Sequence, residues 1–289
     1  MQIIVDSGGT KADWSIVSNG QKIASFKSKG FQPFVQSKEE MKDLLQDIVE
    51  QHNSLSAAER IYYYGTGCSD REQQEYLKSL MKPFFPNAQI RVRGDLYGAA
   101  LACCGLEEGI VGILGTGSNS CKFDGKRITE NVPSLGFILG DDGSGVSIGK
   151  KLIKDYFYDG MPEDLRAAFE KLIPGHRQEL LDKLYRQQKP NAYLASFARF
   201  AGDNRTEPYI TNLVKDRFRI FVRNQIKKYT SSPNNSVHFV GSIAFYWRNE
   251  LAEVLEEEGF SLGKLISAPI DALTHFHLNF ELEENDRLD

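Results

Sequence analysis

Residues 3–17 read IIVDSGGTKADWSIV, which is an apolar run, a small polar turn and a second apolar run. Short apolar runs that are bounded by Gly and Ser predict buried strands. Asn19 and Gly20 then predict a tight hairpin into a third strand at 22–27, because both residues tolerate a positive φ angle. A similar pattern, IVGILGTGSNSCKF, returns at 110–123. The sequence therefore predicts the same strand, turn and strand twice in one chain.

Helices and strands alternate in the rest of the chain, which predicts an α/β layer fold. In the helix expected at 38–51 the apolar residues share one face, and Ser37 stands in front as a cap. Further helices are expected at 70–81, 95–104, 163–172, 177–187, 192–201, 210–228, 243–258 and 270–278, and further strands at 60–65, 90–93 and 236–240.

The order of these elements predicts two domains, at 1–108 and 109–270. The second domain carries a helical insertion at 162–230. Residues 271–289 are expected to form a C-terminal helix and a charged tail, with the option of packing back on the first domain.

Composition excludes several classes of protein. The 289 residues carry 35 Lys and Arg against 39 Asp and Glu, a net charge of −4 that gives no reason to expect a nucleic-acid or membrane partner. The longest tempting uncharged stretch, 96–106, is much shorter than the ~20 residues of a membrane span. The first residues lack the pattern of a secretory signal, and the four cysteines form no Cys-x-x-Cys pair. We expect a cytoplasmic protein with reduced thiols.

Three glycine-rich turns follow predicted strands, at 6–11, 115–119 and 241–242. Glycine lets the backbone come close to a ligand, and successive N–H groups can bind an anion. One such turn alone is more often a plain hairpin, but three at strand ends favour phosphate binding. None of them has the Walker or the Rossmann spacing.

Carboxylates stand beside these turns. Asp6 closes the first strand, where it could hold a phosphate-bound Mg²⁺ through water or make a local Asx turn. Asp95 precedes a helix, where it could be a helix cap, a general base for a substrate hydroxyl, or both if its carboxylate projects into a cleft. The hexamer GDDGSG at 140–145 suits hydroxyl recognition, the water shell of a metal, or simply a solvated acidic turn.

In this order the motifs resemble a known family. DSGGTK at 6–11, GD at 94–95, GTGSN at 115–119, Gly136 with GDDGS at 140–144, and GS at 241–242 are similar to the N-acetylglucosamine kinases of the BadF-type ATPase group. This group belongs to the actin and hexokinase superfold. The resemblance runs from residue 2 to about residue 278.

The resemblance implies two ribonuclease-H-like domains with a central nucleotide cleft, and ATP and Mg²⁺ as cofactors. It makes Asp95 the catalytic base on the 6-hydroxyl of the sugar, and it is compatible with a water-mediated Mg²⁺ at Asp6. The nucleotide would be bound by Gly8, Gly9, Thr10, Lys11, Gly115, Thr116, Gly117, Ser118, Gly241 and Ser242. The sugar would be bound by Gln32, Gly67, Asp95, Gly136 and Asp141.

Two positions depart from the family pattern. Gln32 stands where the family usually has Asn, and Leu135 precedes Gly136 where the vertebrate enzymes carry Trp. The expected activity is an ATP-dependent kinase of N-acetylglucosamine or a related amino sugar. The alternatives are a BadF-type ATPase that activates a partner enzyme, and a sugar or nucleotide sensor without turnover. A small-molecule sugar is the expected partner, and the resemblance leaves room for a homodimer.

Overall fold

The computed structural model describes the chain except for residues 32, 34–35, 174–175, 188, 230–234 and 281–289. It divides into two compact units. Unit 1 comprises Met1–Glu107, Phe123–Ile128 and Ala268–Asp289, and unit 2 comprises Glu108–Lys122 and Thr129–Ser267. Residues 123–128, which the sequence analysis assigns to the second domain, therefore belong to unit 1. The segment expected to form the C-terminal helix and tail, 271–289, is assigned to unit 1 by the same division.

The sheet of unit 1 has five strands: β1 (Gln2–Ser7), β2 (Lys11–Ser18), β3 (Gln21–Lys29), β4 (Arg60–Gly65) and β5 (Gln89–Gly94). Their order is β3-β2-β1-β4-β5. The first three strands are antiparallel neighbours, and β4 and β5 add to β1 in parallel. The expected hairpin is confirmed, since Asn19 and Gly20 have φ angles of 51° and 73°.

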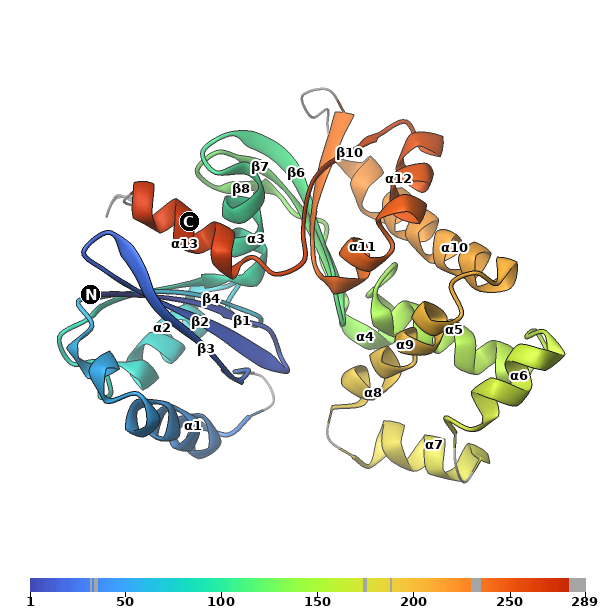
Figure 1. Ribbon diagram of the computed structural model, residues 1–289, viewed down its shortest axis with the longest axis horizontal. Coiled ribbons are helices and arrows are strands. Elements are labelled where there is room, and N and C mark those ends of the chain that lie inside the picture. The colour runs from blue at the N-terminus through green and yellow to red at the C-terminus, as the bar shows by residue number, and fades with distance from the viewer. Residues whose placement is uncertain (32, 34–35, 174–175, 188, 230–234, 281–289) are drawn as a thin grey trace. The chain divides into compact units, whose positions relative to one another are not determined.

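Helices cover both faces of this sheet. α1 (Lys38–Gln51) and α2 (Arg71–Met81) lie on one face, and α3 (Asp95–Cys104) and α13 (Ile270–Asn279) lie on the other (Figure 1). α1 begins as expected, because Ser37 and Glu40 form a reciprocal capping box. Ile3, Val5 and Tyr63 on the α1 face pack with Met41, Leu45 and Leu77. The η1 turn (Asn53–Ala57) connects α1 to β4.

The parallel strands of unit 1 end flush with one another. Ser7 pairs with Gly65, and Gly65 pairs with Gly94. The residues that follow these positions are therefore placed along one edge of the sheet. This register brings the ends of β1, β4 and β5, which are far apart in the sequence, to the same edge of the sheet.

Unit 2 repeats the sheet of unit 1. Its strands are β6 (Glu108–Leu114), β7 (Ser118–Asp124), β8 (Ile128–Glu130), β9 (Ser236–Val240) and β10 (Ser261–Ile266), in the order β10-β9-β6-β7-β8. β9 pairs in parallel with both β6 and β10, as β4 does with β1 and β5. The expected repeat is confirmed at the level of strand order.

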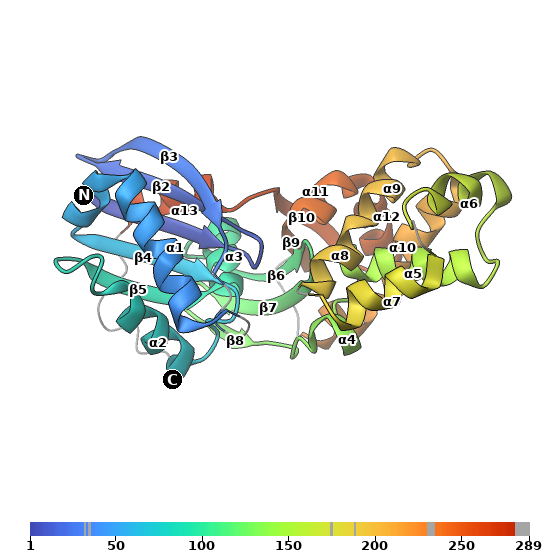
Figure 2. The ribbon, with the colours of Figure 1, turned by 90° about the horizontal axis from the view of Figure 1, so that it is seen from below.

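The helices of unit 2 fill most of its chain (Figure 2). They are α4 (Gly136–Leu139), α5 (Gly145–Phe157), α6 (Glu163–Glu170), α7 (His176–Tyr185), α8 (Pro190–Ser196), α9 (Ala198–Asp203), α10 (Pro208–Asn224), η2 (Ile226–Lys228), α11 (Ser242–Tyr246) and α12 (Arg248–Glu257). Three expected helices are interrupted: 210–228 divides into α10 and η2, 192–201 breaks at the aromatic residue Phe197, and 243–258 breaks at the aromatic residue Trp247. Both aromatic side chains are buried. Periodicity along a helix does not show that the chain bends where such a ring packs.

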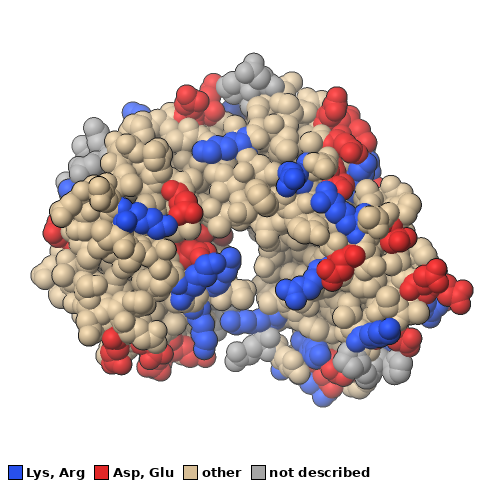
Figure 3. Space-filling model, viewed as in Figure 1, with Lys and Arg blue, Asp and Glu red and all other residues tan. Residues whose placement is uncertain are grey.

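On the face shown in Figure 3, Lys and Arg side chains are interspersed with Asp and Glu side chains. On α10 and α12 they pair directly, for example Arg219 with Glu257 at 2.8 Å and Arg223 with Glu258 at 2.7 Å. Within the described part of the chain, no helix combines the length and the apolarity that crossing a membrane requires.

His277 on α13 anchors this helix to the sheet of unit 1. Its Nε2 lies 2.7 Å from the hydroxyl of Tyr64, and its ring stacks on Tyr62 at 3.8 Å. Burial, helped by the charge of Arg91, lowers the pKa of His277 to about 3. The folded protein therefore keeps this imidazole neutral where the unfolded chain, with a pKa near 6.5, binds a proton.

We expect acid to destabilise unit 1 through His277. The contribution is fully present above about pH 6.5 and is lost as the pH falls towards about 3, amounting to about 3 kcal/mol between pH 7 and pH 4.5. Urea unfolding can be followed by Trp14 fluorescence in a Trp247→Phe background, so that only unit 1 reports. His277→Gln should lose this part of the pH dependence, and identical pH dependence in the two proteins would contradict the prediction.

Candidate functional site

The loop between β1 and β2, residues 8–10, is held against Gly30. The Gly30 N–H donates to Thr10 O at 3.2 Å, and the Phe31 N–H donates to Ser7 Oγ at 3.1 Å. A Cβ atom on Gly30 would lie 2.0 Å from Gly8 O, so only glycine fits. Gly8, Thr10 and Lys11 are exposed, and the loop can therefore present its N–H groups to a ligand. Sequence analysis did not assign Gly30 or Ser7 to the site, and only their place beside recognised motifs could have suggested them.

Asp6 stands on β1 directly opposite Asp13 on β2. Burial, together with the negative charges of Asp95 and Asp13, raises the pKa of the Asp6 carboxyl to about 7, against the opposing effect of the Lys11 charge. Asp13 itself is buried and is paired with Lys11 at 3.8 Å and Lys27 at 3.5 Å. A positive charge brought to Asp6 would relieve this repulsion. Sequence analysis missed Asp13.

Asp95 is the first residue of α3, and Gly94 takes the N-cap position. The N-cap position is therefore one residue earlier than expected for Asp95, which stands at the first position of the helix. Its Oδ1 accepts a hydrogen bond from Leu96 N at 2.8 Å, and its carboxylate also accepts one from the Thr66 hydroxyl. Burial raises the pKa of Asp95, while these two hydrogen bonds lower it.

Thr66 connects Asp95 to the first loop. Its N–H donates to Ser7 O at 3.0 Å, which fixes the turn after β4 against the end of β1. Gly67 follows with a φ angle of 76°, and the Cys68 N–H closes the turn on Gly65 O at 3.3 Å. Sequence analysis found Gly67 but not Thr66. Gln32 lies outside the described residues.

The donor set at this edge fits a magnesium ion that is shared with a nucleotide. Among the described residues, no three His, Cys, Asp or Glu side chains are grouped so that they could hold a metal alone. Mg²⁺ usually takes one or two carboxylates, waters and substrate phosphates rather than an all-protein cage. Asp6, whose ionised form is disfavoured by burial and by its acidic neighbours, is suited to this partial role because a cation would stabilise the ionised form.

The loop of unit 2 between β6 and β7 is fixed by the start of α5. Gly145 N donates to Gly115 O at 2.9 Å and Val146 N donates to Thr116 O at 3.1 Å, while Gly115 N bonds Gly117 O across the turn. Thr116 is exposed at the tip. The carbonyls of Gly115 and Thr116 thus accept hydrogen bonds from the first residues of α5, which leaves the exposed tip of the loop available for a ligand.

Asp141 supports this loop from the acidic turn at 140–145. It adopts a left-handed φ of 59° and is only 8% exposed, and its Oδ1 accepts the Ser118 N–H at 2.9 Å. A Cβ atom on Gly117 would lie 2.7 Å from the same oxygen. Burial raises the pKa of Asp141, and the Ser118 hydrogen bond lowers it. The structure therefore joins two motifs that the sequence separates.

Lys150 on α5 holds the segment that precedes Asp141. Its Nζ donates to Phe137 O at 2.8 Å and to Gly140 O at 3.4 Å. Gly136, with a φ of 66°, begins α4 in this segment. Gly136 and Asp141 are thus parts of one short, anchored stretch.

Gly241 follows β9 and completes the edge of unit 2. Its φ is 122°, and a Cβ atom there would lie 2.3 Å from Leu114 O and 3.1 Å from Gly115 N. Ser242 then opens α11. Unit 2 therefore groups 115–118, Asp141 and Gly241, and unit 1 groups Asp6, 8–11, Gly67 and Asp95. Both sets present backbone donors suited to phosphate, at 115–118 and at 8–11, and unit 1 adds acidic side chains suited to a metal and a base.

No protein-family model matches the chain. The curated N-acetylmuramic acid/N-acetylglucosamine kinase of Clostridium acetobutylicum is 28% identical over 156 residues, which is 52% of this chain. The match spans about half the length of that relative, 51%.

Solved structures match over nearly the whole chain. A protein of Porphyromonas gingivalis, provisionally assigned as an N-acetylglucosamine kinase, is 35% identical with a TM-score of 0.92, and the match covers 98% of this chain and 100% of that one. A protein of Chromobacterium violaceum with the same provisional assignment shares the fold, at 19% identity and a TM-score of 0.71 over 95% and 98% of the two chains. The expected α/β fold with two domains of the actin and hexokinase type is confirmed. On the identity and coverage of the first of these structures, the chain belongs to the N-acetylglucosamine kinase family.

Proposed function

We propose that this protein is an ATP-dependent sugar kinase that transfers the γ-phosphate to the 6-hydroxyl of N-acetylglucosamine or a related amino sugar. The observation that carries the proposal is the arrangement around Asp95. Its carboxylate is buried, it is oriented by Thr66 and Leu96, and it is close enough to Asp6 to influence its charge. Family membership supports the same activity.

Asp95 would act as the general base. Burial makes its ionised form less stable, so it accepts a proton more readily than a solvated carboxylate does. The Thr66 hydrogen bond fixes the carboxylate in one orientation, which favours proton transfer from a hydroxyl within hydrogen-bond reach. The proton of the sugar hydroxyl would pass to Asp95 as the oxygen bonds to the γ-phosphorus, and the bond from this phosphorus to the bridging oxygen would break, with ADP as the leaving group.

The glycine-rich loops would hold the phosphates. Backbone N–H groups of 8–11 and 115–118 and the side chains of Thr10, Lys11 and Thr116 supply donors at two loop tips. Phosphoryl transfer depends mainly on positioning and on stabilising charge. Mg²⁺ associated with Asp6 would neutralise part of the phosphate charge, while Gly241 and Ser242 would border the adenosine.

The sugar would be bound by Gly67, Asp95, Gly136, Asp141 and Gln32. One carboxylate oxygen of Asp141 already accepts the Ser118 N–H, so a sugar contact at Asp141 would also affect the loop at 115–118.

Cys68, Cys103 and Cys121 are buried, and an iron–sulfur cluster needs thiolate ligands from cysteine. Nothing in their placement favours the activator alternative. A homodimer and a cytoplasmic location remain predictions.

A coupled ADP-release assay tests this proposal. The purified protein should turn over with N-acetylglucosamine, N-acetylmuramic acid or glucosamine in the presence of ATP and Mg²⁺, and the product should carry phosphate at the 6-position by NMR. Glucose and mannose serve as comparison sugars, and an Asp95→Asn preparation measures contaminating kinase. ATP hydrolysis that no sugar stimulates would favour the activator, and sugar binding without ADP release would favour the sensor.

A further inference from the structure

Three lysines and one aspartate share one face of the β2–β3 hairpin, beside the first glycine-rich loop. In the register of these strands Lys29 stands directly opposite Lys11, and Lys27 stands directly opposite Asp13. Residues two apart on a strand point to the same face, so all four lie on the face of Asp6, the β1 partner of Asp13. Of the lysines, sequence analysis assigned only Lys11 to the site.

One carboxylate has to balance these three positive charges. The two oxygens of Asp13 lie 3.8 Å from Lys11 Nζ and 3.5 Å from Lys27 Nζ, so each oxygen already has a cation. Lys29 is exposed, and its ammonium has no acidic partner among the residues that the structure describes. Like charges that face each other across neighbouring strands are destabilising. The Lys11–Lys29 pair therefore lowers the stability of the protein without a ligand.

The backbone of Lys29 is fixed beside the first glycine-rich loop. The next residue, Gly30, donates its N–H to Thr10 O at 3.2 Å, and a Cβ atom on Gly30 would lie 2.0 Å from Gly8 O. On the other side, Ser28 Oγ donates to Lys29 O at 2.9 Å. A fixed backbone and an exposed side chain let the ammonium of Lys29 reach a ligand that is bound at this loop.

An anion between Lys11 and Lys29 would replace their repulsion with attraction to a common partner. An ammonium is a compact charge that binds phosphate oxygens, and two ammonium groups on neighbouring strands can bind different oxygens of one polyphosphate. The loop at 8–10 can add its backbone N–H groups to the same ligand. The charge of this corner therefore suits a polyphosphate better than a neutral sugar.

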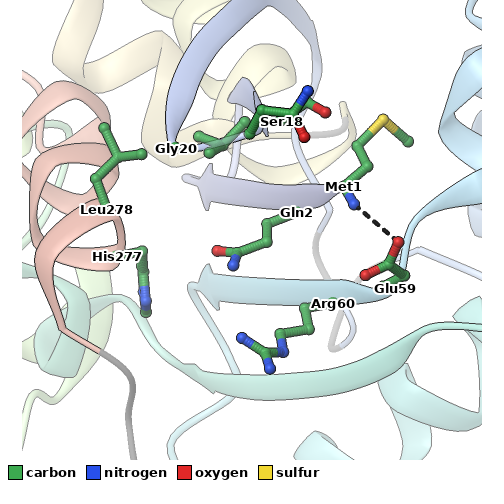
Figure 4. Close-up of a pocket in the computed structure, with 10 residues that line it drawn as sticks. Met1, Gln2, Ser18, Gly20, Glu59, Arg60, His277 and Leu278 are labelled. Atoms are coloured by element: carbon green, nitrogen blue, oxygen red, sulfur yellow. Dashed lines mark hydrogen bonds and ion pairs between the residues drawn. The ribbon is translucent and has the colours of Figure 1, made fainter.

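Charges at the opposite end of the same sheet are paired. A cavity lies there between the amino ends of β1 and β4, the β2–β3 turn and the last turn of α13 (Figure 4), and its acidic residue Glu59 is 3.2 Å from the Met1 nitrogen. Lys22, at that end of β3, pairs with Asp271 at 2.7 Å. All of β3 is described, and Lys29 is the lysine of this strand that lacks an acidic partner. The unbalanced positive charge of β3 is thus at the loop end.

We propose that Lys29 is a further nucleotide-binding residue, which holds the phosphates of ATP together with Lys11. The inference rests on the proposed function and extends it to a residue outside the glycine-rich motifs. The two lysines repel each other in the free protein and share an anion in the complex. Lys29 therefore lowers the stability of the free protein and raises its affinity for ATP, whereas a lysine that only supported the fold would raise the stability.

Calorimetry with Mg²⁺ and a non-hydrolysable ATP analogue tests the proposal. Lys29→Gln should weaken the binding about tenfold or more, as the loss of a charge-assisted hydrogen bond predicts. Lys29→Arg keeps the charge and should weaken the binding less. Lys22→Gln changes the same residue type at the other end of the same strand, and as the matched control it should bind like the wild type. In the ADP-release assay Lys29→Gln should raise the KM for ATP and leave the KM for the sugar unchanged at saturating ATP.

Thermal unfolding without nucleotide gives the second readout. Lys29→Gln should raise the Tm by about 1–3 °C, because it removes the repulsion, and the analogue should then stabilise it less than it stabilises the wild type. A Tm at or below that of the wild type would make Lys29 a structural residue and overturn the proposal. Equal affinity in Lys29→Gln and the wild type would overturn it alone, and a wild type that binds no nucleotide would overturn the proposed function with it.

Discussion

Asp95→Asn is expected to lower kcat by about 10²–10⁴, or roughly 3–5 kcal/mol of barrier, which is the usual contribution of a general base. Asparagine has the same shape, and its Oδ1 can still accept the Leu96 N–H that orients the native side chain. It cannot take a proton at neutral pH. The change therefore removes the base and leaves the start of α3 in place.

ATP affinity is the internal control of this experiment, because Asp95 is not among the residues proposed to bind the nucleotide, which are 8–11, 115–118 and 241–242. Calorimetry with a non-hydrolysable ATP analogue should give similar affinities for the wild type and the variant. Asp70→Asn is the matched control variant, since Asp70 caps α2 through Gln73 N, a role that asparagine fills equally well. If Asp95→Asn keeps wild-type turnover, or if Asp70→Asn loses as much activity, Asp95 is not the base.

The sequence is sufficient to predict the edge of unit 1 because the edge depends on short-range signals. Apolar runs locate β1 and β5, and each ends at a Gly or Ser next to Asp6 or Asp95. Since neighbouring parallel strands end together, the two carboxylates follow from the strand ends alone. The same reasoning places Gly115 and Gly241 on one edge in unit 2.

The supporting contacts could not be predicted, because each one joins segments that are far apart in the chain. Gly30 fits against Gly8, and Asp141 accepts the Ser118 N–H, but no periodicity connects these pairs. Thr66 looks like an ordinary turn residue until β4 is placed beside β1. The functional groups of this site are thus visible in local sequence, and the groups that orient them depend on tertiary packing.

Asp6→Asn is expected to raise the Mg²⁺ concentration for half-maximal activity about 10–100-fold, which is the usual loss of metal affinity when a residue that supports the ligands of a metal is replaced. The amide keeps the shape of the side chain but loses the negative charge that attracts the ion. The measurement is a Mg²⁺ titration of ADP release at fixed ATP and sugar. An unchanged magnesium requirement would remove Asp6 from the metal site.

The acidity of Asp6 gives this prediction a second readout. Because burial raises its pKa to about 7, a proton competes with Mg²⁺ below that pH, and the magnesium requirement of the wild type should rise as the pH falls from 8 to 6. Asp6→Asn has no proton to displace there and should lose this dependence. Asp13→Asn is the matched control, because it removes a neighbouring charge that raises the Asp6 pKa without removing the ligand itself. It should keep the magnesium response and shift its pH dependence to lower pH, whereas a loss equal to that of Asp6→Asn would show that the charge of the whole acidic group, rather than Asp6, binds the ion.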